Sequence, residues 1–114
     1  EWVYSADILE PAELLEAGLV RSVHEPEDLL PAAYELARRF TRNRSPYGVA
    51  LARQLLYRGA GAGHPVEAHR ADSLAMFYAS MADGKEGVAA FLEKRAPSFE
   101  APASRIPDVF GEAR

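Results

Sequence analysis

The chain has 114 residues, of which 48% are hydrophobic and 26% are charged, a balance typical of one globular domain and inconsistent with complete disorder. The absence of cysteine excludes disulfides and thiolate-bound metals and fits a reducing compartment. A net charge of −4 is unfavourable for a general nucleic-acid binder, and no apolar run approaches the ~20 residues of a membrane span. We therefore expect a cytoplasmic protein with no nucleic-acid partner.

The amino-terminal part of the chain predicts short elements. Residues 1–5 contain no methionine and no helix cap, which is typical of the interior of a helix, and we expect the chain to be a fragment of a longer protein. Residues 10–17 predict a short helix with Pro11 in its first turn and Gly18 in a left-handed cap. The β-branched texture of residues 19–23 predicts at most one short strand, or else an extended segment.

Helical spacing predicts two longer helices in the middle of the chain. Glu27 and Asp28 are acids suited to a first turn, and the apolar positions that follow continue to Phe40. Ser45 and Pro46 then have the pattern of an N-cap and a first helical residue. These two helices carry a run of arginines, opposed in this stretch by one acid: Arg38, Arg39, Arg42, Arg44, Arg53 and Arg58. We expect a solvated basic face, with attraction of a polyphosphate or an acidic partner as the alternative.

The second half predicts a flexible turn and two further helices. Residues 59–63 alternate glycine and alanine, and they lack the preceding strand and the Gly-Lys-Ser/Thr ending of a phosphate loop. Pro65 begins a helix whose apolar stripe we expect in the core: Val66, His69, Ser73, Leu74, Phe77, Tyr78 and Met81. Asp83 and Glu86 have the spacing of a capping box that begins the last helix.

The last helix should end near Arg95, because Pro97 cannot continue it. Its i, i+3, i+4 pattern predicts that Val88, Phe91 and Leu92 form a buried face. Beyond it, the proline-rich tail predicts irregular structure with few apolar anchors.

The candidate catalytic and metal patterns are weak. His64 and His69 fall on different faces of a helix, and no H-E-x-x-H arrangement is present, so we expect no metal site. His69, Asp72 and Ser73 are neighbours on one helix and cannot place a nucleophile, a base and an orienting group in series. The residues alone therefore predict no catalytic group.

Two motifs are more specific than these patterns. Residues 11–23, P-A-E-L-L-E-A-G-L-V-R-S-V, and residues 83–95, D-G-K-E-G-V-A-A-F-L-E-K-R, resemble the carboxy-terminal region of the enoyl-CoA hydratase/isomerase (crotonase) superfamily. The resemblance implies a mainly α chain with at most one short strand, taken from a crotonase-like spiral α/β enzyme. Residues 1–24 would end the core, residues 25–99 would form a helical oligomerisation domain, and residues 100–114 an irregular tail.

The resemblance also implies a function for the parent protein, the addition of water to 2-enoyl-CoA thioesters in fatty-acid degradation. The family's oxyanion hole and acid/base groups belong to the preceding spiral domain, so we expect this chain alone to be inactive. Carried over by motif, Phe77 and Lys94 would contact the CoA part of the thioester substrate, with no other cofactor. We expect self-association, as a trimer or hexamer in the parent or by a swap through residues 59–63. The alternative is a free-standing helical interaction module.

Overall fold

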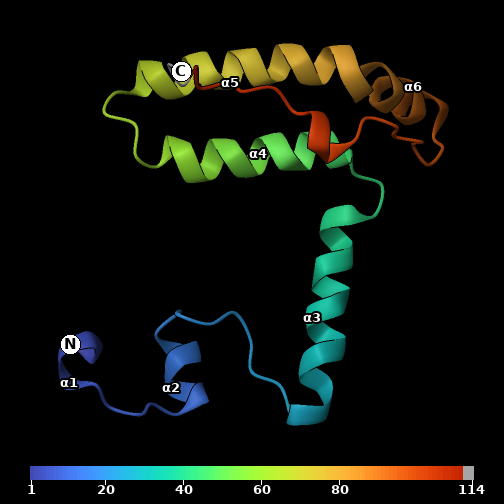
Figure 1. Cartoon of the computed structure of the whole chain (residues 1–114). Coiled ribbons are helices and arrows are strands. Elements are labelled where there is room, and N and C mark those ends of the chain that lie inside the picture. The colour runs from blue at the N-terminus through green and yellow to red at the C-terminus, as the bar shows by residue number, and fades with distance from the viewer. Residues whose placement is uncertain (112–114) are drawn as a thin grey trace. The chain divides into compact units, whose positions relative to one another are not determined.

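The computed structural model describes residues 1–111, which form helices joined by loops and contain no strand (Figure 1). The chain forms two compact units, Glu1–Arg38 and Arg39–Arg114. The elements in chain order are α1 (Trp2–Ser5), α2 (Pro11–Glu16), α3 (Pro26–Thr41), α4 (Pro46–Gly59), α5 (Pro65–Ala79), the π-helix η1 (Ser80–Gly84), α6 (Lys85–Glu93) and the 3-10 helix η2 (Ala103–Arg105). The mainly α fold class is confirmed, and none of the described residues belongs to a membrane-spanning helix.

In the first unit, the predicted cap after α2 is confirmed. Gly18 has a φ of +77°, where a residue with a Cβ is strained. Its N–H donates to the Leu15 carbonyl at 3.1 Å, and the Leu19 N–H donates to the Leu14 carbonyl at 3.0 Å, the paired bonds of a Schellman motif. The short strand predicted after this cap does not form, because residues 19–23 meet no partner strand in the part of the chain described here.

In the second unit, α4 and α5 lie side by side and run antiparallel (Figure 1). The predicted N-cap of α4 is confirmed, because the Ser45 hydroxyl accepts the Gly48 N–H at 3.0 Å. Helix α5 begins at Pro65, as predicted, and the His64 ring caps it by accepting the Val66 N–H on Nδ1 at 3.1 Å. Both caps satisfy backbone donors that would otherwise have no partner.

The prediction that the large apolar residues of α5 form the core is wrong. Phe77 and Met81 are 58% and 66% exposed, whereas Ala71 and Ala75 are each 3% exposed. These alanines belong to the core cluster with Tyr47 and Leu51 of α4, and their small side chains let the two helices approach closely. The size of an apolar side chain is therefore a poor guide to burial on α5, because the contact between the two helices needs small residues on one of them.

The remaining part of this core comes from the tail. Residues 100–111 contain η2 as their regular element, yet Val109 is 5% exposed and belongs to the core cluster. Ala101, Ile106 and Phe110 pack against it. The expectation of few apolar anchors is therefore wrong for the described part of the tail, while residues 112–114 lie outside the described residues.

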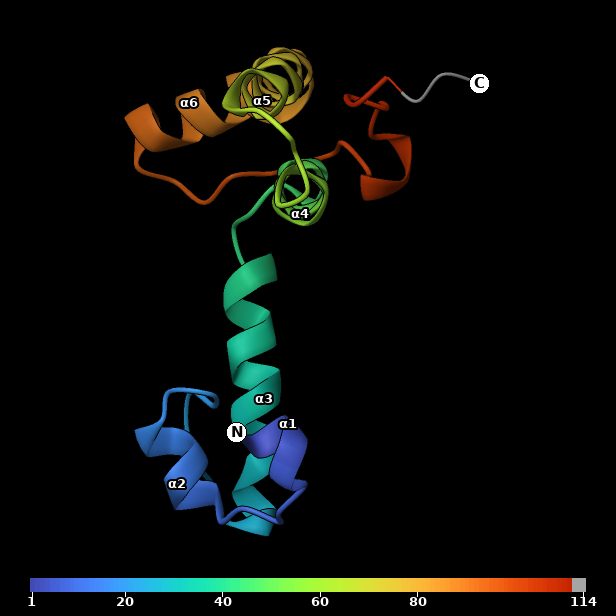
Figure 2. The ribbon, with the colours of Figure 1, turned by 90° about the vertical axis from the view of Figure 1, so that its left-hand side faces the viewer.

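The prediction that Asp83 begins a helix is also wrong. Helix α5 continues through η1 into α6, and the axis changes direction at this π-helix (Figure 2), a known cause of sharp bends. Asp83 is 8% exposed and makes no cap bond. Its carboxylate accepts hydrogen bonds from the Ser45 hydroxyl at 2.5 Å, the Ala101 N–H at 3.1 Å and the Glu100 N–H at 3.3 Å. These partners, distant in sequence, prevail over the local cap.

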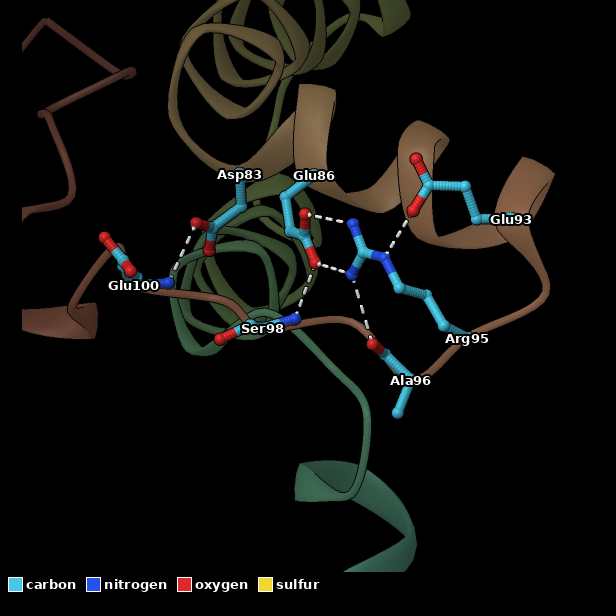
Figure 3. A network of polar contacts seen from close by, with 7 residues as sticks. All are labelled: Asp83, Glu86, Glu93, Arg95, Ala96, Ser98 and Glu100. Carbon is cyan, nitrogen blue, oxygen red and sulfur yellow. Dashed lines mark hydrogen bonds and ion pairs between the residues drawn. The ribbon is translucent and has the colours of Figure 1, made fainter.

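Glu86 likewise binds the segment after α6 instead of the cap (Figure 3). Its carboxylate forms a two-pronged ion pair with Arg95, at 2.5 and 2.8 Å, and accepts the Ser98 N–H at 2.7 Å. Arg95 also donates to Glu93 at 2.6 Å. The Arg95 guanidinium and the Ser98 N–H together lower the pKa of Glu86 to about 2, and the two glutamates raise the pKa of Arg95.

Helix α6 ends at Glu93, within two residues of the predicted position. Its apolar stripe, however, is not buried in this chain, because Val88, Phe91 and Leu92 are 62%, 82% and 72% exposed. The apolar spacing along α6 predicted that this face would be covered. Such spacing does not indicate which segment covers the face.

We predict that Asp83→Ala destabilises the second unit. The change leaves a hydroxyl and two backbone N–H groups without their acceptor, and an unsatisfied buried group typically costs about 1–3 kcal/mol. Urea denaturation followed by circular dichroism measures the free energy of unfolding. Asp72→Ala, on the exposed side of α5, is the matched control, and equal midpoints for the two variants would contradict the role of Asp83.

We predict that the contacts of the Glu86 carboxylate with Arg95 and Ser98 stop stabilising the fold in acid. The folded chain lowers the pKa of Glu86 from 4.5 to about 2. Between these two pH values the unfolded chain binds more protons than the folded chain, so the folded state becomes less stable as the pH is lowered. The contribution is complete above about pH 4.5 and disappears near pH 2. The difference in unfolding midpoint between wild type and Glu86→Gln should shrink as the pH is lowered across this window, and a difference that stayed constant would contradict the role of the Glu86 carboxylate.

Candidate functional site

Phe77 lies in the last turns of α5 with 58% of its surface exposed. Its ring meets that of Tyr78 edge to face, with centroids 5.6 Å apart and planes at 71°. This contact covers one edge of the ring. An exposed aromatic ring can stack on a planar group such as a purine.

Lys94 follows α6 directly and has a left-handed backbone, with a φ of 54°. Its N–H donates to the Phe91 carbonyl at 3.3 Å, and the next N–H, of Arg95, donates to the Ala90 carbonyl at 3.0 Å. The Arg95 guanidinium is engaged by Glu86 and its neighbour Glu93, whereas the Lys94 ammonium has no ion pair within residues 1–111. Of the two cations at this helix end, Lys94 is the one available to an external anion.

The structure does not bring these two predicted residues into one pocket. η1 and the whole of α6 lie between Phe77 and Lys94 along the chain, and the helix bends between them (Figure 2). No ring contact, hydrogen bond or ion pair joins them in the described part of the chain. They are separate exposed groups, and a ligand that used both would have to reach from one to the other.

Two open cavities adjoin this region. One, of about 540 Å³, lies between the tail and η1 and is lined in part by Tyr47, Asp83 and Glu86. The carboxylates are already bound by protein donors, and burial, with a smaller effect of Tyr78, raises the pKa of Tyr47. This cavity is therefore lined by groups that already hold the fold together.

The other cavity, of about 560 Å³, is a groove along α6. It is lined by Ser80, Gly84, Lys85, Val88, Ala89 and Leu92. An apolar groove with one cation at its edge suits a hydrocarbon or the apolar face of another protein segment, and it continues the exposed stripe of α6.

Arg38, Arg44, Arg53 and Arg58 of the central run each contact a different group of the protein. Arg53 lies 4.8 Å from the Tyr57 ring centroid, and Arg44 donates to the Asn43 carbonyl at 3.1 Å. Arg58 lies 3.6 Å from an Asp108 oxygen. In the first unit, Arg38 pairs with Glu35 at 3.5 Å. These contacts favour the solvated face over a single convergent anion site.

Sequence reasoning missed one pair of chemically active side chains. Ser22 Oγ and His24 Nε2 are 2.7 Å apart, the separation of a nucleophile and a base. Both side chains are exposed and two residues apart in an irregular segment, and no third side chain orients the imidazole among residues 1–111. The part of the chain that the structure describes also contains no cluster of three or more potential metal ligands.

Comparison with known proteins accounts for the two motifs. Residues 1–102 match the family model of enoyl-CoA hydratase/isomerase. Enoyl-CoA hydratase AFT3-1 of Alternaria alternata is 39% identical over 102 residues, covering 86% of this chain and 33% of its own length. Crotonyl-CoA hydratase of Syntrophomonas wolfei is 34% identical over 102 residues, covering 85% of this chain and 37% of its own length.

The chain thus spans about a third of the length of these curated relatives. The family match includes both motifs, the whole of α1 to α6 and the residues that hold the tail to Asp83 and Glu86. It covers far more than half of the sequence. The chain belongs to the enoyl-CoA hydratase/isomerase family.

Proposed function

We propose that the chain is the carboxy-terminal helical part of an enoyl-CoA hydratase, which adds water to the double bond of a 2-enoyl-CoA thioester. The single observation that carries this proposal is the match of residues 1–102 to the family, together with relatives that are named hydratases. The chain corresponds to about a third of those relatives, so its own contribution is to binding and assembly.

The exposed stripe of α6 supports a role in assembly. Phe91 and Leu92 are 82% and 72% exposed, and the groove beside them is lined mainly by apolar side chains. Side chains of this size are costly to leave in water, at about 25 cal/mol per Å² of apolar surface. In the proposed parent protein this face covers another part of the enzyme or a neighbouring subunit.

Phe77 and Lys94 would serve the CoA end of the substrate. The exposed Phe77 ring offers a face to the adenine, and the Lys94 ammonium offers a charge to a phosphate. Because the two groups do not share a pocket in this chain, each would contribute one weak contact to a site completed by other parts of the parent protein.

We predict that the isolated chain binds CoA weakly and that Lys94 carries part of the affinity. Lys94→Ala should weaken binding by about two- to fivefold, the contribution of an exposed ion pair. Isothermal titration with CoA, with Lys85→Ala as the matched control, measures the difference. Phe77→Ala compared with Met76→Ala tests the stacking contact in the same assay. Micromolar affinity that survives Lys94→Ala would contradict the assignment.

We predict that the chain self-associates through α6. Replacing a Leu that becomes buried on association by Asp removes a contact worth more than ~1.4 kcal/mol, so Leu92→Asp should raise the dissociation constant at least about tenfold. Light scattering over a concentration series measures the change in mass. Leu56→Asp, on α4 and 74% exposed, is the matched control. A clean monomer for the wild-type chain at micromolar concentration would remove this part of the proposal.

A further inference from the structure

The segment Ile106–Phe110, called the docking segment below, lies outside the region that matches the family, which ends at residue 102. Although it is irregular, Val109 is 5% exposed, and Ile106 and Phe110 pack against the core cluster. The chain therefore places a segment beyond the family match into the middle of its second unit.

The docking segment fills a groove between two helices, called the α4–α5 groove. Tyr47 and Leu51 come from α4, and Ala71 and Ala75 come from α5; all four belong to one buried cluster with Val109. The alanines have no side chain beyond Cβ, which leaves space beside α4 for an extended segment. The groove is thus apolar and takes a β-branched side chain at its centre.

Arg58 adds a charge at one end of the groove. Its guanidinium lies 3.6 Å from an Asp108 oxygen and 4.2 Å from the centroid of the Phe110 ring. Asp108 also accepts the Phe110 N–H at 3.0 Å, which folds the segment so that the carboxylate and the ring reach the same arginine. The groove therefore recognises an acid and an aromatic residue on either side of a buried valine.

The docking segment is attached like a bound peptide. The Arg105 N–H donates to the Pro102 carbonyl at 3.1 Å just before it, and within it the Phe110 N–H donates to the Asp108 carboxylate at 3.0 Å. The bonds to Asp83 end at Ala101. The single turn of η2 lies between these hydrogen bonds and the docking segment. The hydrogen bonds to Asp83 are thus made by residues that precede the docking segment, so release of the segment from the groove does not require them to break.

We propose that the α4–α5 groove is a docking site for an extended peptide and that its occupant in an assembly is the docking segment of a second copy of this chain. The complementarity is present within one chain, so the same contacts form between two chains when the segment exchanges, as in domain swapping. This interface is separate from the stripe of α6 and does not depend on the proposed hydratase function.

The first experiment empties the groove in the full chain. Val109→Asp should expel the tethered segment, whereas Val3→Asp, at a site of the first unit that is 91% exposed, should leave it in place. A fluorescent peptide of residues 103–111 should bind the Val109→Asp chain at least about tenfold more tightly than wild type or the control, because a short tether holds its competitor at about millimolar effective concentration. Equal affinities for the two variants, or no binding to either, would overturn the groove as a docking site.

The second experiment tests exchange between copies and does not need Val109. Chains carrying Arg58→Asp or Asp108→Arg each bring like charges together internally but opposite charges when mixed. The chain has no cysteine, so one introduced cysteine per chain allows donor and acceptor labelling. Energy transfer is measured over a concentration series to give an apparent affinity between chains. This affinity should be about two- to fivefold higher in the mixture than for labelled wild-type chains, the range of an exposed ion pair.

The double variant Arg58→Asp/Asp108→Arg is the control for this mixture. It restores opposite charges within each chain, so transfer between its labelled copies should return to the wild-type level. Association through α6 alone would give the same transfer in all three samples. That outcome would overturn the second copy as the occupant, whether or not the Val109→Asp chain folds.

Discussion

The second unit depends on one nearly buried carboxylate. Asp83 accepts a hydrogen bond from the Ser45 hydroxyl at the start of α4 and two from backbone N–H groups of the tail, so two segments that are distant in sequence are joined to η1 through one acceptor. A carboxylate at 8% exposure is costly to bury unless its oxygens are matched by donors, and here the donors are the groups whose positions must be fixed. The bend of the long helix at η1, the cap of α4 and the path of the tail are thereby linked.

The fold could be predicted from sequence where a signal and its partner lie within a few residues. Gly18 reports its own backbone conformation, and Ser45 and Pro65 report helix starts, because caps are formed between neighbours in sequence. The pair Asp83 and Glu86 has the same kind of local signal, but its carboxylates bind groups nine or more residues away. A local pattern contains no information about such competitors.

The same limit applies to burial. Spacing on α5 favours its largest apolar side chains as the core, yet the helix contact selects Ala71 and Ala75 because α4 needs close approach. The candidate residues Phe77 and Lys94 came from motif resemblance, and the structure adds that one is an open ring and the other a cation beside an arginine already paired with two glutamates. Their relation to each other could not be predicted, because the helix bend between them lies at the π-helix η1, which the apolar spacing does not report.

The backbone conformation of Lys94 affects the stability of the helix end, whereas its side chain supplies the charge. A left-handed φ of 54° costs a residue with a Cβ about 1–2 kcal/mol, a strain that glycine escapes. Stability alone would therefore favour glycine at this position, since the helix end needs only the backbone N–H. A lysine here makes the helix end less stable and places a positive charge beside it. Exchange of Lys94 for glycine would therefore relieve the backbone strain and remove this charge in a single step.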